Sequence, residues 1–325
     1  MKKLLATLLT LALAGTMLTG CGGNQSASQS SNSQASTKGP IAIVVPQAEH
    51  GWMAGIAYYA EQKCKELGLE QGKGYKLVTS ANVNEQANDI EEMINLGASA
   101  VVLLPHTDEV SVAAKKIVDA KIPLVVFDRK VNADYSSYVA GDNSGMGTAG
   151  ANFLGEKLGG KGIIAVQNVP SSGSVSTERV GSFKKVMAAK YPNIKLIDIT
   201  TPDFTQQAGL KTGTDVLTAN PQIDAIFSID DESSQGFLQA IKDAKRTDVK
   251  YLSGGGGAQA YFQKINTETQ PECFTSTYSP SMIGDAVQAA VDLANGKQVK
   301  KDNIIAPTVV TKDNVKKLLD EKSPY

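Results

Sequence analysis

Residues 100–129 read AVVLLPHTDEVSVAAKKIVDAKIPLVVFDR. Residues 100–104 and 124–127 are continuous apolar runs, which is the pattern of strands buried on both faces of a sheet. Residues 109–120, between these runs, carry apolar side chains at helical spacing. A strand, a helix and a second strand in this order indicate a parallel sheet with helices on its faces.

The same alternation of strands and helices continues on both sides of this stretch. Further strands are expected at residues 41–45, 75–79, 163–167, 195–200, 225–229, 249–252 and 274–277. Helices are expected at residues 52–67, 85–96, 176–190, 206–219, 233–244 and 282–294, with a last helix from about Asp313. Similar orders of elements recur about 120 residues apart. We therefore predict an α/β protein with two similar, doubly wound lobes, each built on a parallel sheet.

The composition agrees with two globular lobes and excludes several classes of protein. At about 150 residues per domain, 325 residues suggest two domains. An apolar content of 42% suffices for sizeable cores, and 32 Lys and Arg against 33 Asp and Glu argue against a general nucleic-acid binder. Three cysteines are too few for a disulfide-stapled scaffold, and two histidines limit histidine catalysis and metal binding. The sequence also lacks a Gly-x-Ser-x-Gly motif, which argues against a hydrolase. We expect neither an enzyme nor a cofactor.

The first residues indicate export and lipid attachment. Two lysines precede an apolar stretch that is shorter than the roughly 20 residues needed to span a bilayer. The stretch ends in Leu18-Thr19-Gly20-Cys21, which resembles the lipobox of bacterial lipoproteins. This resemblance implies that residues 1–20 are a signal peptide and that Cys21 carries the lipid. An ordinary cysteine buried in a membrane-anchor helix is the alternative.

Residues 21–39 differ in composition from the rest of the chain. They consist mostly of Gly, Ser, Gln, Asn, Ala and Thr, so they have little apolar surface to bury. We expect a flexible tether between the lipid on Cys21 and the folded lobes. Such a protein works outside the cytoplasm, beside the membrane that holds its anchor.

The ends of the expected strands identify candidate ligand-binding residues, because ligands of open α/β sheets bind beyond the carboxyl ends of the strands. This rule selects residues 47–52, Asn82, His106, Asp128 and Arg129 in the first lobe, and residues 171–179, Asp203, Phe204, Asp230, Asp231 and residues 254–257 in the second. Carboxylates and guanidinium groups hydrogen-bond well with hydroxyl groups, and aromatic faces cover apolar C–H surfaces. These residue types suit a polyhydroxylated ring.

Several stretches share a pattern with one known family. They are residues 41–45 with Trp52 downstream, Pro-Leu-Val-Val-Phe-Asp-Arg at 123–129, Gly-Asp-Asn-Ser at 141–144, Glu178-Arg179, Asp203-Phe204, Asp-Asp-Glu at 230–232 and residues 280–284. Over residues 40–311 the chain resembles the periplasmic sugar-binding proteins of ABC transporters, most closely the ribose-binding type. The resemblance implies a type I periplasmic binding fold with two lobes joined by a three-stranded hinge. The lobes would comprise residues 40–142 with 279–305 and residues 143–278 with 306–325, with crossings near residues 140–144, 278–280 and 305–308.

The resemblance also implies which residues hold a ligand between the lobes. They are His50, Trp52, Met53, His106, Asp128, Arg129, Arg179, Phe204, Asp230 and Tyr278. Met53 replaces an aromatic residue of the family, His106 follows a proline where the family has a binding asparagine, and Tyr278 replaces a glutamine. The loop Ser-Gly-Gly-Gly-Gly at 253–257 lacks the aspartate with which the family binds sugar. The resemblance therefore predicts a sugar-like ligand without specifying ribose.

The function that we expect is that of the substrate-binding component of an ABC importer. As a monomer, it would capture a monosaccharide or small polyol and deliver it to a permease and its ATPase subunit. A protein that binds a sugar acid or another signalling molecule, for chemoreception or sensing, is the alternative. Regulators of the lactose-repressor kind share the fold, but they need an N-terminal helix-turn-helix where this chain has its signal and tether. A metal-binding lipoprotein that uses His50 and His106 is also conceivable.

Overall fold

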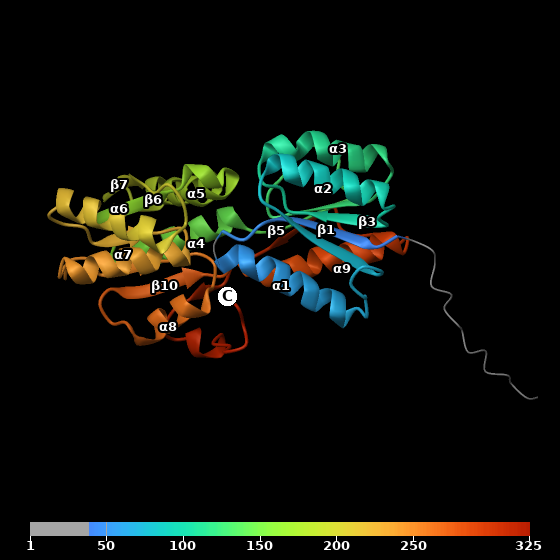
Figure 1. The fold of residues 1–325 in the computed structure, drawn as a ribbon. Helices are drawn as coiled ribbons and strands as arrows, with labels where there is room; N and C mark the ends of the chain where they lie inside the picture. Colours follow the sequence, from blue (N-terminus) through green and yellow to red (C-terminus); the bar gives the residue numbers. More distant parts are fainter. Residues whose placement is uncertain (1–38, 50) are drawn as a thin grey trace, which may run out of the picture. The chain divides into compact units, whose positions relative to one another are not determined.

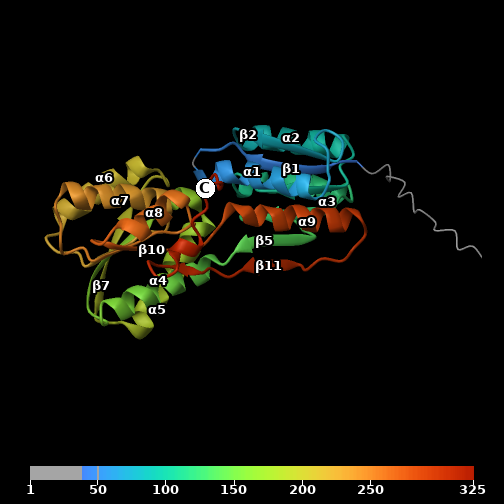
Figure 2. The same ribbon diagram turned by 90° about the horizontal axis from the view of Figure 1, so that it is seen from below.

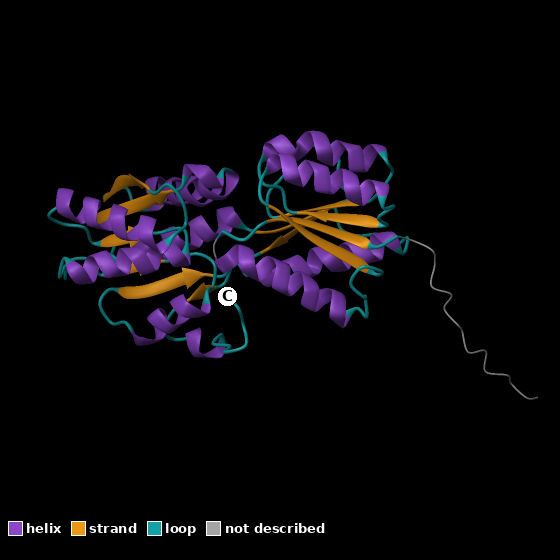
Figure 3. Cartoon of the chain, in the orientation of Figure 1, coloured by secondary structure: helices purple, strands orange, loops and turns teal. Residues whose placement is uncertain are grey.

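The computed structural model describes residues 39–49 and 51–325, which Figure 1 follows along the chain by colour. The expected signal peptide, Cys21, the tether up to residue 38 and His50 lie outside the described residues. The described residues belong to one compact unit. Helices lie on both faces of each of two sheets within this unit (Figure 3).

The first sheet has six strands in the order β11, β5, β4, β3, β1, β2, and all its pairs are parallel. Its strands are β1 (Ile41–Pro46), β2 (Tyr75–Ser80), β3 (Ala100–Leu103), β4 (Leu124–Phe127), β5 (Ser137–Gly141) and β11 (Asp302–Ile305). Its helices are α1 (Gly51–Glu66), α2 (Val83–Asn95), α3 (Ser111–Asp119) and α9 (Ile283–Ala294). The short 3₁₀ helix Asp108–Val110 leads into α3.

Alternate residues of β1 explain why this sheet carries helices on both faces. Ile41, Ile43 and Val45 belong to the core that includes α1 and α9. Ala42 and Val44 belong to the core under α2 and α3, which lie on the opposite face of the sheet (Figures 1 and 2). Because successive side chains of a strand point to opposite faces, a strand covered on both sides is apolar throughout. The continuous apolar runs in the sequence have this origin.

The second sheet repeats the strand order of the first, as β12, β10, β9, β8, β6, β7. Its strands are β6 (Gly162–Asn168), β7 (Ile194–Thr200), β8 (Ala225–Phe227), β9 (Tyr251–Ser253), β10 (Glu272–Ser276) and β12 (Val309–Val310). Its helices are α4 (Asn143–Lys157), α5 (Ser174–Lys190), α6 (Gln206–Ala219), α7 (Asp231–Asp243) and α8 (Gln259–Thr267). Only the β10–β12 pair is antiparallel among the described strands. The predicted α/β class with two similar, doubly wound sheets is confirmed.

Three segments connect the two sheets, after β5, after β10 and after β11. They lie against one another through backbone hydrogen bonds. The Asp142 N–H donates to the Ile305 carbonyl oxygen at 2.9 Å, and the Thr277 N–H donates to the Thr308 carbonyl oxygen at 2.9 Å. The middle segment contains the 3₁₀ helix Pro280–Met282 at the start of α9. Any movement of one sheet relative to the other has to be absorbed in these segments.

The structure differs from the sequence-based expectations in several elements. The strands β5, β11 and β12 and the helices α4 and α8 were not predicted. Helix α4 was missed because its glycines weaken the helical pattern, although close packing requires them: a methyl group on Gly147 would lie 2.0 Å from the Arg179 carbonyl oxygen. The helix expected from Asp313 is wrong, since this segment forms only the 3₁₀ turn Val315–Lys317. There the Asn314 side chain bonds the Thr311 N–H and the Val309 carbonyl, and such local bonds compete with a helix.

Candidate ligand-binding site

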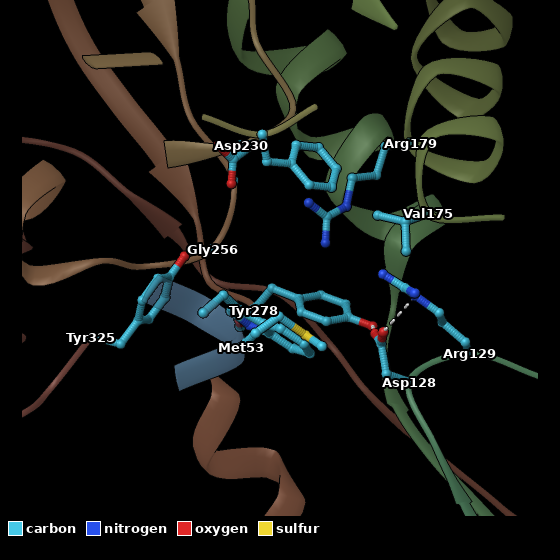
Figure 4. Close-up of a pocket in the computed structure, with 12 residues that line it drawn as sticks. Met53, Asp128, Arg129, Val175, Arg179, Asp230, Gly256, Tyr278 and Tyr325 are labelled. Carbon is cyan, nitrogen blue, oxygen red and sulfur yellow. Dashed lines mark hydrogen bonds and ion pairs between the residues drawn. The ribbon is translucent and has the colours of Figure 1, made fainter. Parts of the chain in front are cut away.

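A pocket lies where the carboxyl ends of strands from both sheets meet (Figure 4). It holds about 420 Å³ of space not filled by protein atoms, and this space is partly open to solvent. It is lined by Trp52, Met53, Asp128, Arg129, Val175, Arg179, Phe204, Asp230, Gly255, Gly256, Tyr278 and Tyr325. These include every predicted site residue except His50, which lies outside the described residues, and His106.

Asp128 enters the pocket directly after β4, in an unusual backbone conformation. Its φ of 62° is in the left-handed region, which aspartate tolerates better than most residues. The conformation is held on both sides, because the Asp128 N–H donates to the Val139 carbonyl at 2.9 Å and the Tyr138 hydroxyl donates to the Asp128 carbonyl at 2.7 Å. The Asp128 carboxylate accepts a hydrogen bond from the Tyr278 hydroxyl. This carboxylate is 5% exposed and thus fixed in orientation.

Arg129 follows with its guanidinium group at one end of the pocket (Figure 4). Its Nη1 donates to the His106 carbonyl oxygen at 2.7 Å, and its Nε lies 3.9 Å from an Asp128 carboxylate oxygen. That Nε is buried and has no hydrogen-bond partner among the described residues. A buried donor without a partner loses the free energy of its hydration, so an arriving acceptor would gain from bonding it.

Arg179 extends from α5 and is 5% exposed. Its Nε donates to the Asn143 side-chain oxygen at 2.8 Å, and its Nη1 donates to the Ile229 carbonyl oxygen at 2.7 Å. Its guanidinium carbon lies 4.7 Å from the centre of the Tyr278 ring. The planar fork is therefore oriented by three contacts, while Nη2 makes no hydrogen bond within the described part of the chain.

Asp230 ends the loop after β8 and caps α7. Its Oδ1 accepts hydrogen bonds from the Ser233 N–H at 2.8 Å and from the Ser233 hydroxyl at 3.1 Å. Burial raises the pKa of Asp230 to about 8, helped by the nearby charges of Asp231 and Glu232 and opposed by the bonds from Ser233. With a pKa of about 8, this carboxyl group is mostly protonated at pH 7.

Trp52 forms an apolar wall of the pocket and also belongs to the core of its lobe. Its indole ring is nearly parallel to the Phe127 ring, with centres 6.3 Å apart and planes at 5°. The indole Nε1 donates to the Tyr278 carbonyl oxygen at 2.8 Å. Phe204 and Met53 add further apolar surface. Charged groups beside aromatic and apolar walls can hold a molecule with polar edges and apolar faces.

Known proteins share this architecture. Residues 41–298 match the periplasmic binding protein domain. The chain belongs to this family. Its members are extracytoplasmic solute-binding proteins and not enzymes.

The periplasmic binding protein described here has relatives along almost its whole length. The ribose import binding protein of Bacillus subtilis is 27% identical over 313 residues, which cover 94% of this chain and 98% of the relative. The xylitol-binding protein of Mycolicibacterium smegmatis is 28% identical over 243 residues, which cover 73% of this chain and 68% of the relative. A solved structure of an ABC transporter solute-binding protein from Actinobacillus succinogenes with bound D-allose has a TM-score of 0.78 at 22% identity, and the match covers 86% of this chain and 100% of that one. This likeness confirms the fold.

In this periplasmic binding protein, His106 supports the pocket from outside. Its ring Nε2 is hydrogen-bonded with the Ser80 carbonyl oxygen at 2.7 Å, and its backbone N–H donates to the Gln86 side-chain oxygen at 2.8 Å. Its carbonyl oxygen accepts from Arg129. The structure therefore does not bring His106 into the pocket but gives it a part in positioning Arg129.

Asp231, which the strand-end rule also selected, lies behind the pocket wall. Its carboxylate accepts hydrogen bonds from the Ala258 N–H at 2.7 Å and from the Thr275 hydroxyl at 2.6 Å. A methyl group on Gly254 would lie 2.1 Å from this carboxylate. The glycines of residues 254–257 thus let the loop close around a buried carboxylate, and the loop presents Gly255 and Gly256 to the pocket.

Of the residues that line the pocket, only Tyr325 falls outside the residues and ranges that the sequence analysis selected. Val175 falls within residues 171–179, which the strand-end rule selected as a range without singling it out. Tyr325 follows no strand directly, so the rule does not reach it.

Other features of the described residues bear on the remaining expectations. No group of three or more His, Cys, Asp or Glu residues in the described part of the chain could hold a metal ion. None of the helices in residues 39–49 and 51–325 is long and apolar enough to cross a membrane. Cys64 on α1 and Cys273 on β10 are both buried free thiols, and burial raises the pKa of each to about 12.

Proposed function

We propose that this protein captures a neutral monosaccharide or small polyol between its lobes and delivers it to an ABC permease with its ATPase subunit. The observation that carries the proposal is the pocket itself, in which guanidinium and carboxyl groups from both lobes, all buried except the half-buried Arg129, surround a space walled by Trp52 and Phe204. Sugar hydroxyls donate and accept hydrogen bonds, so they can pair with both kinds of group. The names of the relatives, which refer to ribose and xylitol, support the same ligand class.

The two-lobed lining suggests how capture takes place. The first lobe supplies Trp52, Asp128 and Arg129, and the second supplies Arg179 and Asp230. A ligand that contacts both sets binds the closed arrangement more tightly than the open one and shifts the population toward it. The connections between the sheets, near residues 140–144, 278–280 and 305–308, act as the hinge between lobes of residues 40–142 with 279–305 and residues 143–278 with 306–325. A permease can then recognise the closed shape.

The ligand class is tested by calorimetric titration and thermal shift with D-ribose, D-allose, xylitol, myo-inositol and the corresponding aldonates. Two guanidinium groups face two carboxyl groups in the pocket, and their charges balance once Asp230 is ionised, a state that hydroxyl donors of a neutral ligand favour. The second candidate is a sugar acid, because a protonated Asp230 leaves the two guanidinium groups with one carboxylate. Tighter binding of an aldonate than of any aldose or polyol would establish the second candidate in place of the first.

Affinity for a neutral sugar is expected to rise between about pH 7 and pH 9, by up to about tenfold. Burial raises the pKa of Asp230 to about 8 in the protein without bound sugar. Sugar hydroxyls that donate to the carboxylate favour its ionised form, so the bound state has a lower pKa and binding below pH 8 must release a proton. Titrations at several pH values measure this, and Asp230→Asn should abolish the dependence. If the ligand is instead a sugar acid that accepts a hydrogen bond from protonated Asp230, its affinity falls as the pH rises.

Anchoring is proposed to depend on Cys21, which lies outside the described residues. Cys21→Ser is expected to release the protein from membranes, since serine cannot receive the thioether-linked lipid. Membrane fractionation of cells that express either form measures the release. Labelling with a radioactive fatty acid is the control, and a wild-type protein without label excludes lipid attachment.

A further inference from the structure

Tyr325 is fixed inside the protein between the two lobes, although in the chain it follows none of the strands whose ends supply most of the pocket. It is 7% exposed. Its carbonyl oxygen accepts a hydrogen bond from the Ser323 hydroxyl, and that hydroxyl is also 2.8 Å from the Tyr59 hydroxyl on α1. The segment before it is held to α8, where the Gln259 side chain bonds the Asp320 N–H at 2.8 Å and the Leu318 carbonyl at 3.1 Å. The ring therefore has a defined position.

Glycines border the Tyr325 side chain on two sides, in ordinary van der Waals contact on α1 and at much closer range at Gly256. A methyl group on Gly51 or Gly55, which are one helical turn apart on α1, would lie 3.6 Å or 3.5 Å from Tyr325 carbon atoms. On the other side a methyl group on Gly256 would lie 2.2 Å from the Tyr325 hydroxyl, and the φ of 152° at Gly256 is one that residues with a side chain rarely adopt. The loop that lacks the family's sugar-binding aspartate is thus the loop against which this phenol rests.

Tyr325 also lines two cavities. It lines the pocket described above, at the opposite end from Arg129 (Figure 4). It lines a second cavity of about 600 Å³, partly open to solvent, whose polar wall includes Gln206, Glu232, Gln235 and Gln259. Within the described part of the chain, it is the one residue that the two linings share. Amide and carboxylate groups in this second wall are of the kind that hydrogen-bond sugar hydroxyls.

The Tyr325 side chain is more than nine-tenths buried, yet its hydroxyl oxygen is not enclosed, and no hydrogen bond to it is found within the described part of the chain. Because the hydroxyl is accessible and its ring lines the pocket, a ligand held there can exchange hydrogen bonds with it. We propose that Tyr325 determines ligand size and contacts the ligand: its hydroxyl bonds a sugar hydroxyl, and its ring closes off the second cavity so that only a single-ring sugar or small polyol fits. This inference rests on the proposed function, because it concerns the same pocket.

Two substitutions separate the roles of the ring and the hydroxyl. Tyr325→Phe keeps the wall and removes one hydrogen bond, so affinity for a single-ring ligand should fall about three- to tenfold while two-ring sugars stay excluded. Tyr325→Ala joins the two cavities, and the ratio of two-ring to single-ring affinity should rise at least about tenfold. Tyr325→Leu, which keeps apolar contact with Gly55, replaces the alanine variant should that variant not fold. Tyr58→Ala is the matched control, because Tyr58 is 40% exposed on α1 and lines neither cavity.

The experiment is calorimetric titration of the full-length wild type and these variants with D-ribose, D-allose, xylitol and myo-inositol, and with maltose, sucrose and cellobiose as two-ring probes. We expect the wild type to bind at least one of the single-ring sugars or small polyols and none of the two-ring sugars. The role of Tyr325 is overturned, and the proposed function is not, by the following outcome. The wild type binds a single-ring ligand, the ratio of two-ring to single-ring affinity is unchanged in the alanine and leucine variants, and the phenylalanine variant binds as tightly as the wild type. A wild type that binds no sugar or polyol overturns the proposed function and this inference with it.

Discussion

Replacing Arg179 with alanine is expected to weaken ligand binding by about ten- to a hundredfold or more and to lower the free energy of unfolding by about 2–4 kcal/mol. Affinity falls because the pocket loses a charged donor that is already oriented by Asn143 and Ile229. Stability falls because the side-chain oxygen of Asn143 and the carbonyl oxygen of Ile229 lose their donor in buried surroundings. Calorimetric titration with the ligand identified from the sugar panel measures the first effect, and urea-induced unfolding without ligand measures the second.

Two further variants separate the contact with ligand from general effects of charge on α5. Arg179→Lys keeps the positive charge but cannot form the planar fork that reaches both protein acceptors, so its affinity should stay at least about tenfold below that of the wild type. Lys184→Ala removes an exposed cation from the same helix, where Lys184 pairs with Asp198 on the surface, and should leave affinity unchanged. If Arg179→Ala and Arg179→Lys bind as tightly as the wild type, this guanidinium does not contact the ligand.

The sheets were predictable because burial on both faces leaves a local signal in the sequence. Each residue of β1 is buried by a helix on one side or the other, so the strand is apolar at every position. The edge strand β11 is half exposed, with the pattern exposed, intermediate, exposed, intermediate, and it lacks that signal. Helix α4 lost its signal for a different reason, because the glycines that permit close packing on α5 and β8 remove apolar side chains from its face.

The pocket was partly predictable because parallel strands place their carboxyl ends together, and this rule located Asp128, Arg129 and Asp230. The sequence does not indicate which distant residue forms a hydrogen bond with each of these side chains. The Tyr278 hydroxyl bonds the carboxylate of Asp128 although 150 residues separate them in the chain. His106 satisfies the rule, yet Ser80 and Gln86 engage its ring and backbone outside the pocket. Strand ends identify the region, whereas hydrogen-bond partners decide which side chains reach the ligand.

Asp128→Asn and Asp128→Ala are expected to weaken ligand binding alike, by about ten- to a hundredfold, and to differ in stability. Both substitutions remove the negative charge beside Arg129 and the carboxylate that faces the pocket. Asparagine tolerates the left-handed backbone at residue 128 and can still accept from the Tyr278 hydroxyl, so its free energy of unfolding should stay within about 1 kcal/mol of the wild type. Alanine tolerates this conformation poorly and leaves the buried Tyr278 hydroxyl without its acceptor, which should cost about 2–4 kcal/mol.

The pair of variants also tests whether Asp128 acts on closure of the lobes as well as on the ligand. Tyr278 lies in the segment that joins β10 to α9, so its bond to Asp128 ties a hinge segment to the end of β4. Small-angle scattering with and without saturating ligand should show a smaller radius of gyration in the bound wild type, and also in Asp128→Asn once enough ligand is added to saturate it. In Asp128→Ala the hinge segment is no longer bonded to the end of β4. The change in radius of gyration on ligand binding should therefore differ from that of Asp128→Asn at equal saturation. Equal affinities for the wild type and both variants would remove Asp128 from the binding site, and an unchanged radius of gyration in the saturated wild type would exclude capture by closure of the two lobes.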